Sequence, residues 1–255
     1  MKKIAKYVIL DILRNRIMIA YTVLLLLISF SVFSLEDNVE KSVLSLINLV
    51  LLIVPLVSII FSTIYVYNSS EFIELLVAQP VKRKSIWLSI FLGLAVSLSL
   101  AFFVGVGIPI LLYSPGSNGM VLTVSGMALS VIFVSIAMLA SVLTRDKAKG
   151  IGASILLWFF FTLIYDGIVL FILFQFGDYP MEKPMIALTS LNPVDLARVM
   201  MLLKLDISAL MGYTGALFNE VFGGNMGMIY AIVILMLWAA LPLWVSLRKF
   251  SAKDL

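Results

Sequence analysis

Residues 68–91 read NSSEFIELLVAQPVKRKSIWLSIF, and this polar stretch separates two long apolar runs. It carries two carboxylates, a proline and a basic triplet at 82–84. The runs on either side, 42–70 and 85–144, contain no charged residue. A Lys or Arg at the centre of a bilayer costs about 2.5–3.5 kcal/mol on insertion scales. We therefore expect this stretch to lie in water at a membrane surface, where a soluble partner could press on it.

The composition is that of a polytopic membrane protein. Of the 255 residues, 62% are hydrophobic and 13% are charged, with a mean hydropathy of +1.14, whereas soluble domains carry about 25% charged residues. Charge-free runs long enough to cross a bilayer of about 30 Å predict membrane helices. They lie at 17–35, 42–67, 85–113, 120–144, 150–177 and 221–247. The sequence thus predicts an all-α fold of six transmembrane helices in a single domain over residues 1–255.

The distribution of Lys and Arg predicts the orientation. With six spans both termini lie on one side, and that side receives fourteen of the eighteen cations, including the triplet at 82–84. The other side receives only Lys41, Lys183, Arg198 and Lys204. Loops rich in Lys and Arg face the cytoplasm. We therefore expect both termini and the 68–91 segment, including the coupling part 68–84, in the cytoplasm. This charge needs no nucleic-acid partner to explain it.

Several kinds of chemistry lack their residues. The chain has no cysteine and no histidine, so disulfides and thiolate or imidazole metal sites are excluded. It has no Gly-Lys pair, so no phosphate-binding loop of the Walker type occurs. Seven of the thirteen methionines lie in 181–228, and thioethers bind Cu(I), but they form no compact cluster and methionine commonly fills apolar space. We expect no metal site and no cofactor in this chain.

Residues 1–16 have the pattern of a short basic amphipathic helix. One side is an apolar stripe at helical spacing, and Lys2, Lys3, Lys6 and Arg14 lie opposite. Such a helix is expected at the interface of an anionic leaflet. It could anchor the topology or contact a cytoplasmic partner, and both roles are compatible. The stripe comprises Ile4, Ala5, Val8, Ile9 and Ile12.

The fifth predicted span contains a carboxylate that cannot reach an interface. Asp166 follows Tyr165 and lies fifteen residues beyond Ile151, roughly 22 Å from that end. An ionisable group at such depth suggests a function. The alternative is a protonated or hydrogen-bonded side chain that holds helices or subunits together. No Lys or Arg lies within the predicted spans to pair with it.

Between spans five and six, residues 178–220 are predicted to lie outside the membrane as a helical segment. Asn192 fits the N-cap of a helix, Pro193 its first position and Asp195 its first turn, where a carboxylate meets the positive end of the helix dipole. A second apolar piece, 207–222, is expected at the outer interface. The apolar face of the first helix comprises Leu196, Val199, Met200 and Leu203.

The polar stretch itself contains a helix of about two turns that stops before Pro80. Its sequence, Glu74-Leu75-Leu76 followed by Gln79-Pro80-Val81, Arg83 and Ile86, resembles the cytoplasmic signature of ABC-2 type permeases. The later segments WFFFTLIYDGIVL at 158–170 and LNPVDLARVMML at 191–202 are similar to those of the permeases that serve maturation of nitrous oxide reductase. The similarity covers most of the chain.

This resemblance implies a permease subunit that is not itself an enzyme. A separate ABC ATPase in two copies would hydrolyse ATP with Mg²⁺, and the chain would form a homodimer. The resemblance implies coupling to that ATPase through Glu74, Leu75, Leu76, Gln79, Pro80 and Arg83. It also implies a location in the bacterial inner membrane and a periplasmic β-helix protein, which would contact Asn192, Pro193, Asp195 and Arg198. Of the intramembrane polar pair Tyr165 and Asp166, Asp166 would relay movement together with the intervening spans.

Two mechanisms remain open at this point, namely movement of a copper or sulfur species across the membrane and transmission of force to the periplasmic partner. The scarcity of polar residues in the spans favours force. Two other functions are compatible with the sequence. One is a generic ABC-2 exporter of lipid, drug or polysaccharide, and the other is a membrane anchor or assembly scaffold without ATP coupling.

Overall fold

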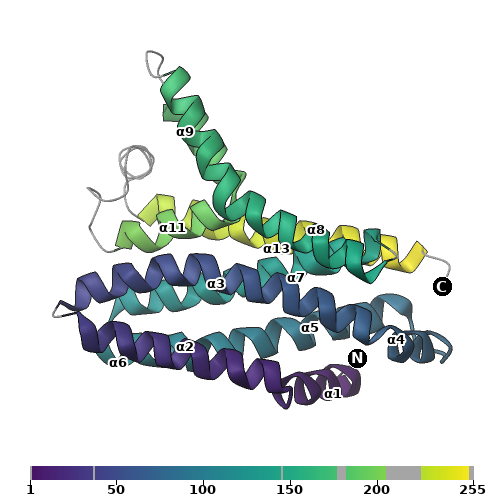
Figure 1. The fold of residues 1–255 in the computed structure, drawn as a ribbon. Coiled ribbons are helices and arrows are strands. Elements are labelled where there is room, and N and C mark those ends of the chain that lie inside the picture. Colours follow the sequence, from purple (N-terminus) through teal and green to yellow (C-terminus); the bar gives the residue numbers. More distant parts are fainter. Residues whose placement is uncertain (1, 37, 145, 177–181, 205–224, 253–255) are drawn as a thin grey trace.

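The computed structural model describes residues 2–36, 38–144, 146–176, 182–204 and 225–252. Every regular element in these ranges is helical. Figure 1 shows the long helices lying side by side, with both termini and α4 at one end of the bundle. We call this end the terminal face and the opposite end, where α2 joins α3, the outer face.

The predicted membrane helices are confirmed. Six helices are long and apolar enough to cross a bilayer: Arg16–Leu35, Val39–Asn68, Arg83–Tyr113, Gly119–Leu143, Lys147–Gln175 and Gly227–Ala252. Five agree with the predicted spans to within a few residues at each end. The sixth ends five residues later than predicted, and the start predicted for it at 221 lies outside the described residues.

The first half of the chain contains α1 (Lys2–Leu13), α2 (Arg16–Leu35), α3 (Val39–Asn68), α4 (Ser70–Val77), α5 (Arg83–Phe102), the π-helical turn η1 (Phe103–Gly107) and α6 (Ile108–Tyr113). The second half contains α7 (Ser117–Leu143), α8 (Lys147–Phe159), the π-helical turn η2 (Phe160–Ile164), α9 (Tyr165–Gln175), α10 (Glu182–Ser190), α11 (Pro193–Lys204) and α13 (Asn225–Ala252).

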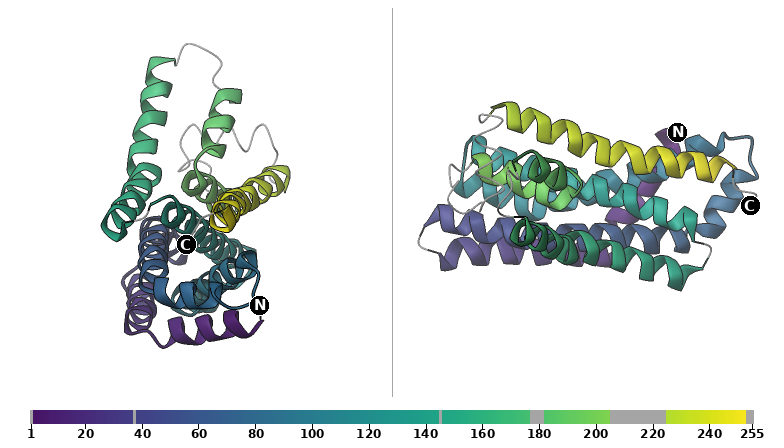
Figure 2. Two further views of the ribbon diagram at one scale, coloured as in Figure 1. Left: turned by 90° about the vertical axis from the view of Figure 1, so that its right-hand side faces the viewer. Right: turned by 90° about the horizontal axis from the view of Figure 1, so that it is seen from above.

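Helix α7 is the centre of the bundle, because it packs against α3, α5, α11 and α13. It is the most buried of the six spans, whereas the α8–α9 span and α13 present most of their apolar side chains outward. Figure 2 shows α13 lying along one side of the bundle. Fully buried aromatic side chains, such as Phe102 and Phe133, fill the core around α7.

Helix α1 packs against α5 with part of its predicted apolar stripe. Val8 and Ile12 are fully buried, and α1 meets α5 at Gly93, where a Cβ atom would overlap the Val8 side chain. The Tyr65 hydroxyl donates to Asp11 Oδ2 at 3.1 Å. The stripe thus faces protein, and the location of α1 at the lipid interface stays a prediction.

Each π-helical turn interrupts a membrane span and changes the backbone hydrogen-bond pattern of that helix. At η1 the Ser29 hydroxyl donates to the Gly105 carbonyl at 3.1 Å, and a Cβ at Gly105 would overlap Leu25. Glycine in the third span therefore permits close packing against α2. At η2 the fifth span turns away from the bundle, so that α9 projects from it (Figure 1).

The segment predicted to lie outside the membrane packs against the bundle, which the sequence did not predict. Its helix begins at Pro193 as expected, but α10 and α11 are bent by 109° relative to one another, and α11 packs back against α7, α13 and α3. The apolar side chains of α11 are buried almost all round the helix, and its location outside the membrane stays a prediction. The second predicted piece, 207–222, lies outside the described residues.

The close approach of α1 and α5 generates a stability prediction. Gly93→Ala places a methyl group against Val8, and overpacking of this kind costs about 1–3 kcal/mol. Gly152→Ala is the matched control, because no atom lies within 4 Å of the added methyl group and alanine favours the helix. Thermal unfolding of both variants in one detergent measures the difference. Equal stability of the two variants would contradict the packing.

Candidate functional site

Helix α4 forms the surface predicted to couple to an ATPase. It begins after Ser69 with Glu71 in its first turn and ends at Val77, three residues before Pro80. Ile73 and Leu76 are buried against the bundle, whereas Leu75 is 67% exposed. The opposite directions of Leu75 and Leu76 follow from helix geometry, since adjacent residues point to different faces.

The six residues predicted for coupling therefore fall into three groups by exposure. Glu74, Leu75, Gln79 and Pro80 are exposed together on the terminal face, and Arg83 is half-buried at the start of α5. Leu76 faces the bundle, so its side chain is not available to a partner at this surface. Leu76 instead holds α4 in place.

A cavity of about 190 Å³ lies behind α4. It separates this helix from the ends of α3, α5, α7 and α13 that are predicted to face the cytoplasm. Its walls include Ile73 and Glu74 from α4, Trp87 from α5 and Phe250 from α13. Sequence reasoning did not single out Trp87 or Phe250. Their positions could have indicated them, since each is a large aromatic residue next to the Lys and Arg residues that flank a membrane span.

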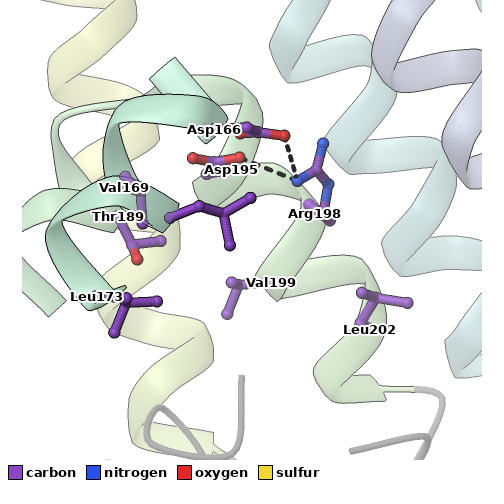
Figure 3. Close-up of a pocket in the computed structure, with 9 residues that line it drawn as sticks. Asp166, Val169, Leu173, Thr189, Asp195, Arg198, Val199 and Leu202 are labelled. Carbon is purple, nitrogen blue, oxygen red and sulfur yellow. Dashed lines mark hydrogen bonds and ion pairs between the residues drawn. The ribbon is translucent and has the colours of Figure 1, made fainter. Parts of the chain in front are cut away.

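A second site lies where α9, α10 and α11 meet, shown in Figure 3. Arg198 Nη1 donates to Asp166 Oδ2 at 3.0 Å and to Asp195 Oδ1 at 3.2 Å. The expectation that Asp166 lacks a cationic partner is wrong. The fold of α11 back onto the bundle brings Arg198 to the fifth span from 32 residues along the chain.

This cluster holds two carboxylates and one guanidinium. The Asp195 side chain is 14% exposed, and those of Asp166 and Arg198 are 34% and 35% exposed. A cavity of about 190 Å³ adjoins the cluster, with apolar walls from α9 and α11. They include Val169, Leu170, Leu173, Val199 and Leu202.

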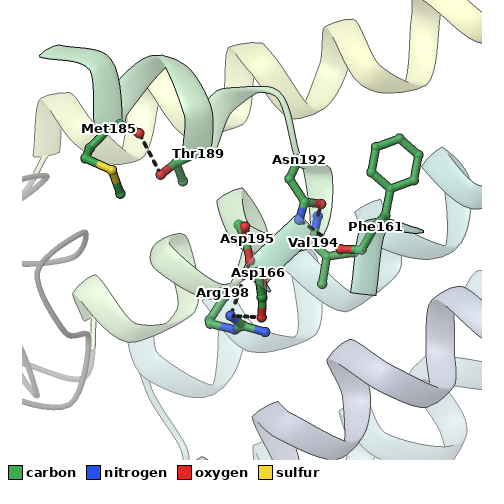
Figure 4. Close-up of polar contacts among 8 residues, drawn as sticks. All are labelled: Phe161, Asp166, Met185, Thr189, Asn192, Val194, Asp195 and Arg198. Carbon is green, nitrogen blue, oxygen red and sulfur yellow. Dashed lines mark hydrogen bonds and ion pairs between the residues drawn. The ribbon is translucent and has the colours of Figure 1, made fainter. Parts of the chain in front are cut away.

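Asn192 joins the bend in the fifth span to the start of α11 (Figure 4). Its Nδ2 donates to the Phe161 carbonyl in η2 at 2.8 Å, and its Oδ1 accepts from the Val194 amide at 3.0 Å. The second contact caps the helix, as the sequence predicted. Nearby, the Tyr165 hydroxyl donates to the Leu188 carbonyl of α10 at 2.6 Å.

The predicted contacts to an outer partner also need correction. Asn192 is 0% exposed and Pro193 is buried, so neither side chain reaches a partner at the surface. Asp195 and Arg198 keep partial exposure. Among the residues that the structure describes, no group of three or more His, Cys, Asp or Glu side chains could hold a metal ion.

Comparison with known proteins agrees with this arrangement. The family model described as "ABC-2 family transporter protein" matches residues 3–255. The chain belongs to the ABC-2 transporter family. It is 27% identical over 264 residues to the "Probable ABC transporter permease protein NosY" of Pseudomonas aeruginosa, covering 95% of this chain and 92% of that protein.

A second relative is similar over the same extent. The protein of the same name from Stutzerimonas stutzeri is 24% identical over 272 residues, covering 98% of this chain and 95% of that protein. Permease subunits of ABC transporters work with a cytoplasmic ATPase. With its six apolar spans, this ABC-2 permease is a multi-pass protein of the bacterial inner membrane.

The buried amide of Asn192 generates the next prediction. Asn192→Ala removes the hydrogen bonds to the Phe161 carbonyl and from the Val194 amide, at a cost of about 2–4 kcal/mol. Asn38→Ala is the control, because Asn38 caps α3 through the Glu40 amide but is exposed, and we expect a loss of about 1 kcal/mol there. Thermal unfolding distinguishes the two, and equal losses would count against the bridging role of Asn192.

Substitution within the charged cluster should have unequal effects. Arg198→Met leaves two neighbouring carboxylates without their cation, whereas Asp166→Asn leaves Arg198 paired with Asp195. Because the side chains are partly exposed, we expect losses of about 1–2 kcal/mol and less than about 1 kcal/mol, respectively. Thermal unfolding at low ionic strength measures both. An Asp166→Asn variant less stable than Arg198→Met would contradict this arrangement.

Proposed function

We propose that this permease couples ATP hydrolysis in a separate ATPase to maturation of the copper site of nitrous oxide reductase. The observation that supports this most is similarity over nearly the whole chain to two proteins named as NosY permeases. We call the site where α9, α10 and α11 meet the outer site. The motifs at 158–170 and 191–202 contribute its main parts, namely η2, Asp166, Asn192 and Arg198.

The ATPase would bind at α4, with the terminal face in the cytoplasm. Leu75 is an exposed apolar side chain on a surface that otherwise carries Glu74, Gln79 and the basic triplet at 82–84. An exposed leucine flanked by polar groups fits an apolar groove of a partner. A homodimer of the permease would carry two ATPase copies, one on each α4.

We favour force transmission over movement of a small species, because the spans carry few charged side chains. The hydroxyls in the spans do not decide between the two mechanisms. Those of Thr22 and Ser130 donate to carbonyls four residues earlier in their own helices, whereas those of Ser58, Ser62 and Ser97 are buried without a partner. The charged cluster sits at α9–α11, away from the cavity behind α4.

The outer partner, a periplasmic β-helix protein, would contact the region of α9–α11. Asp195 and Arg198 would supply charged contacts at the surface, while Asn192 and Pro193 would support this region from inside. Asp166 would fix Arg198 to the fifth span, so that movement of α8–α9 also moves α11.

A pair of leucine variants tests this function. Leu75→Asp places a charge in the proposed apolar contact and should weaken ATPase binding about tenfold or more. Leu35→Asp is the control, because Leu35 is also highly exposed but lies at the outer end of α2. Each variant is expressed in a strain lacking the chromosomal copy, and the copper content of nitrous oxide reductase is measured.

The expected result is that loss of the permease lowers the copper content, and that Leu35→Asp restores it but Leu75→Asp does not. Normal copper content without the permease would rule out the maturation function and favour a generic ABC-2 exporter. Full restoration by Leu75→Asp would exclude coupling through this surface and favour a scaffold without ATP coupling.

A further inference from the structure

Trp87 connects the region behind α4 to the last membrane helix. Its side chain is 2% exposed and lines the cavity whose other wall contains Ile73 and Glu74 of α4. The Trp87 ring stacks on Phe250 of α13 with centroids 4.3 Å apart, and its Nε1 donates to Ser246 Oγ at 3.2 Å. One rigid side chain therefore contacts both the cavity and α13.

At the other end, α13 is joined to the bend between α10 and α11. Trp238 Nε1 donates to the Ser190 carbonyl at 3.0 Å. The Tyr230 hydroxyl and Ser190 Oγ lie 2.9 Å apart in a second hydrogen bond. Ser190 is the last residue of α10, directly before the 109° bend that leads into α11.

Helix α13 packs against α7, and one hydrogen bond joins the two helices beside Trp238. Ser135 Oγ of α7 donates to the Ala239 carbonyl at 2.6 Å. Pro242 lies between Ala239 and Ser246, and because proline has no N–H, the helix loses a hydrogen bond there and bends more easily. Helix α13 is therefore bonded to the central helix near its middle, with the contacts of Ser246 and Tyr230 on either side.

We propose that Trp87 and Trp238 are positioning residues through which α13 transmits movement. On this route, movement passes from the ATPase-coupling helix α4 to the bend between α10 and α11. This inference rests on the proposed function and adds the route by which movement crosses the membrane. A push on α4 reduces the cavity and displaces Trp87, which moves Ser246 and Phe250. Movement of α13 about its contact with Ser135 then shifts Ser190 and with it α11.

The dimensions suit this role. Ser246 and Trp238 are eight residues apart, and Tyr230 is eight residues further, which gives about 12 Å for each arm of the helix. The cavity of about 190 Å³ leaves space next to α4 for displacement. One side of α13 packs against α7, α11 and α5, and most of its other side chains face away from the bundle.

The chain offers a matched set of tryptophans for a test. Trp158 Nε1 donates to the Leu52 carbonyl at 3.1 Å, a bond of the same kind that joins α8 to α3 and does not involve α13. Trp87→Leu, Trp238→Leu and Trp158→Leu each remove one ring and one N–H. The corresponding Phe variants keep one aromatic ring but lack the N–H and the second ring of the indole, and they decide the question if a Leu variant fails to assemble.

The readout is the thiol of an Ala187→Cys variant, because Ala187 is exposed on α10 and the chain has no cysteine of its own. The permease with its bound ATPase is placed in nanodiscs. The rate of alkylation by a maleimide is compared in the nucleotide-free and vanadate-trapped states. We expect the rate to differ between the states by about threefold or more without further substitution.

Trp87→Leu and Trp238→Leu should abolish this difference while ATP hydrolysis persists, the Phe variants should reduce it, and Trp158→Leu should retain it. If the difference in alkylation rate survives in Trp87→Leu and Trp238→Leu, the route through α13 is overturned and the proposed function is left intact. If the Leu variants do not assemble, a difference that survives in full in both Phe variants has the same meaning. Equal alkylation rates in the two states without any Trp substitution would overturn force transmission and this inference together.

Discussion

The outer half of the permease depends on one buried amide. In hydrocarbon every backbone polar group needs a partner within the protein, so a span that bends must be supplied with hydrogen bonds, and so must the first amides of a buried helix. The Asn192 side chain serves both, because its Nδ2 reaches the Phe161 carbonyl in η2 and its Oδ1 caps α11. This allows α9 to project while α11 returns to the bundle, and it places Arg198 beside Asp166.

The two ends of the molecule are built on different principles. At the terminal face, α4 presents Leu75 outward and buries Ile73 and Leu76, next to a cavity that leaves it space to move. At the outer site, charged and polar side chains fix three helices to one another. Between them, α7 forms the packed centre, and α13 lies along its side, with contacts to α5 near one end and to α10 at its middle and towards the other end. This arrangement suits the proposed coupling to an ATPase.

Much of this was predictable from the sequence, because charge-free runs and the polar stretch at 68–91 define spans and a surface helix regardless of their packing. The N-cap at Asn192 was also predictable, since capping is local. The return of α11 was not predicted. A signal existed, because Leu196, Ala197 and Met200 to Leu202 make α11 apolar almost all round, and such a helix is buried. The pairing of Asp166 with Arg198 and the direction of Leu76 depend on tertiary packing, which periodicity alone does not give.

The central claim is that this permease works between a cytoplasmic ATPase and a periplasmic protein. The most direct measurement is its purification from native membranes in mild detergent, with mass spectrometry of the proteins that accompany it. The account predicts that an ABC ATPase and a periplasmic β-helix protein are both recovered. Recovery of the ATPase without the periplasmic protein would contradict the maturation function, and recovery of neither in several detergents would contradict the coupling itself.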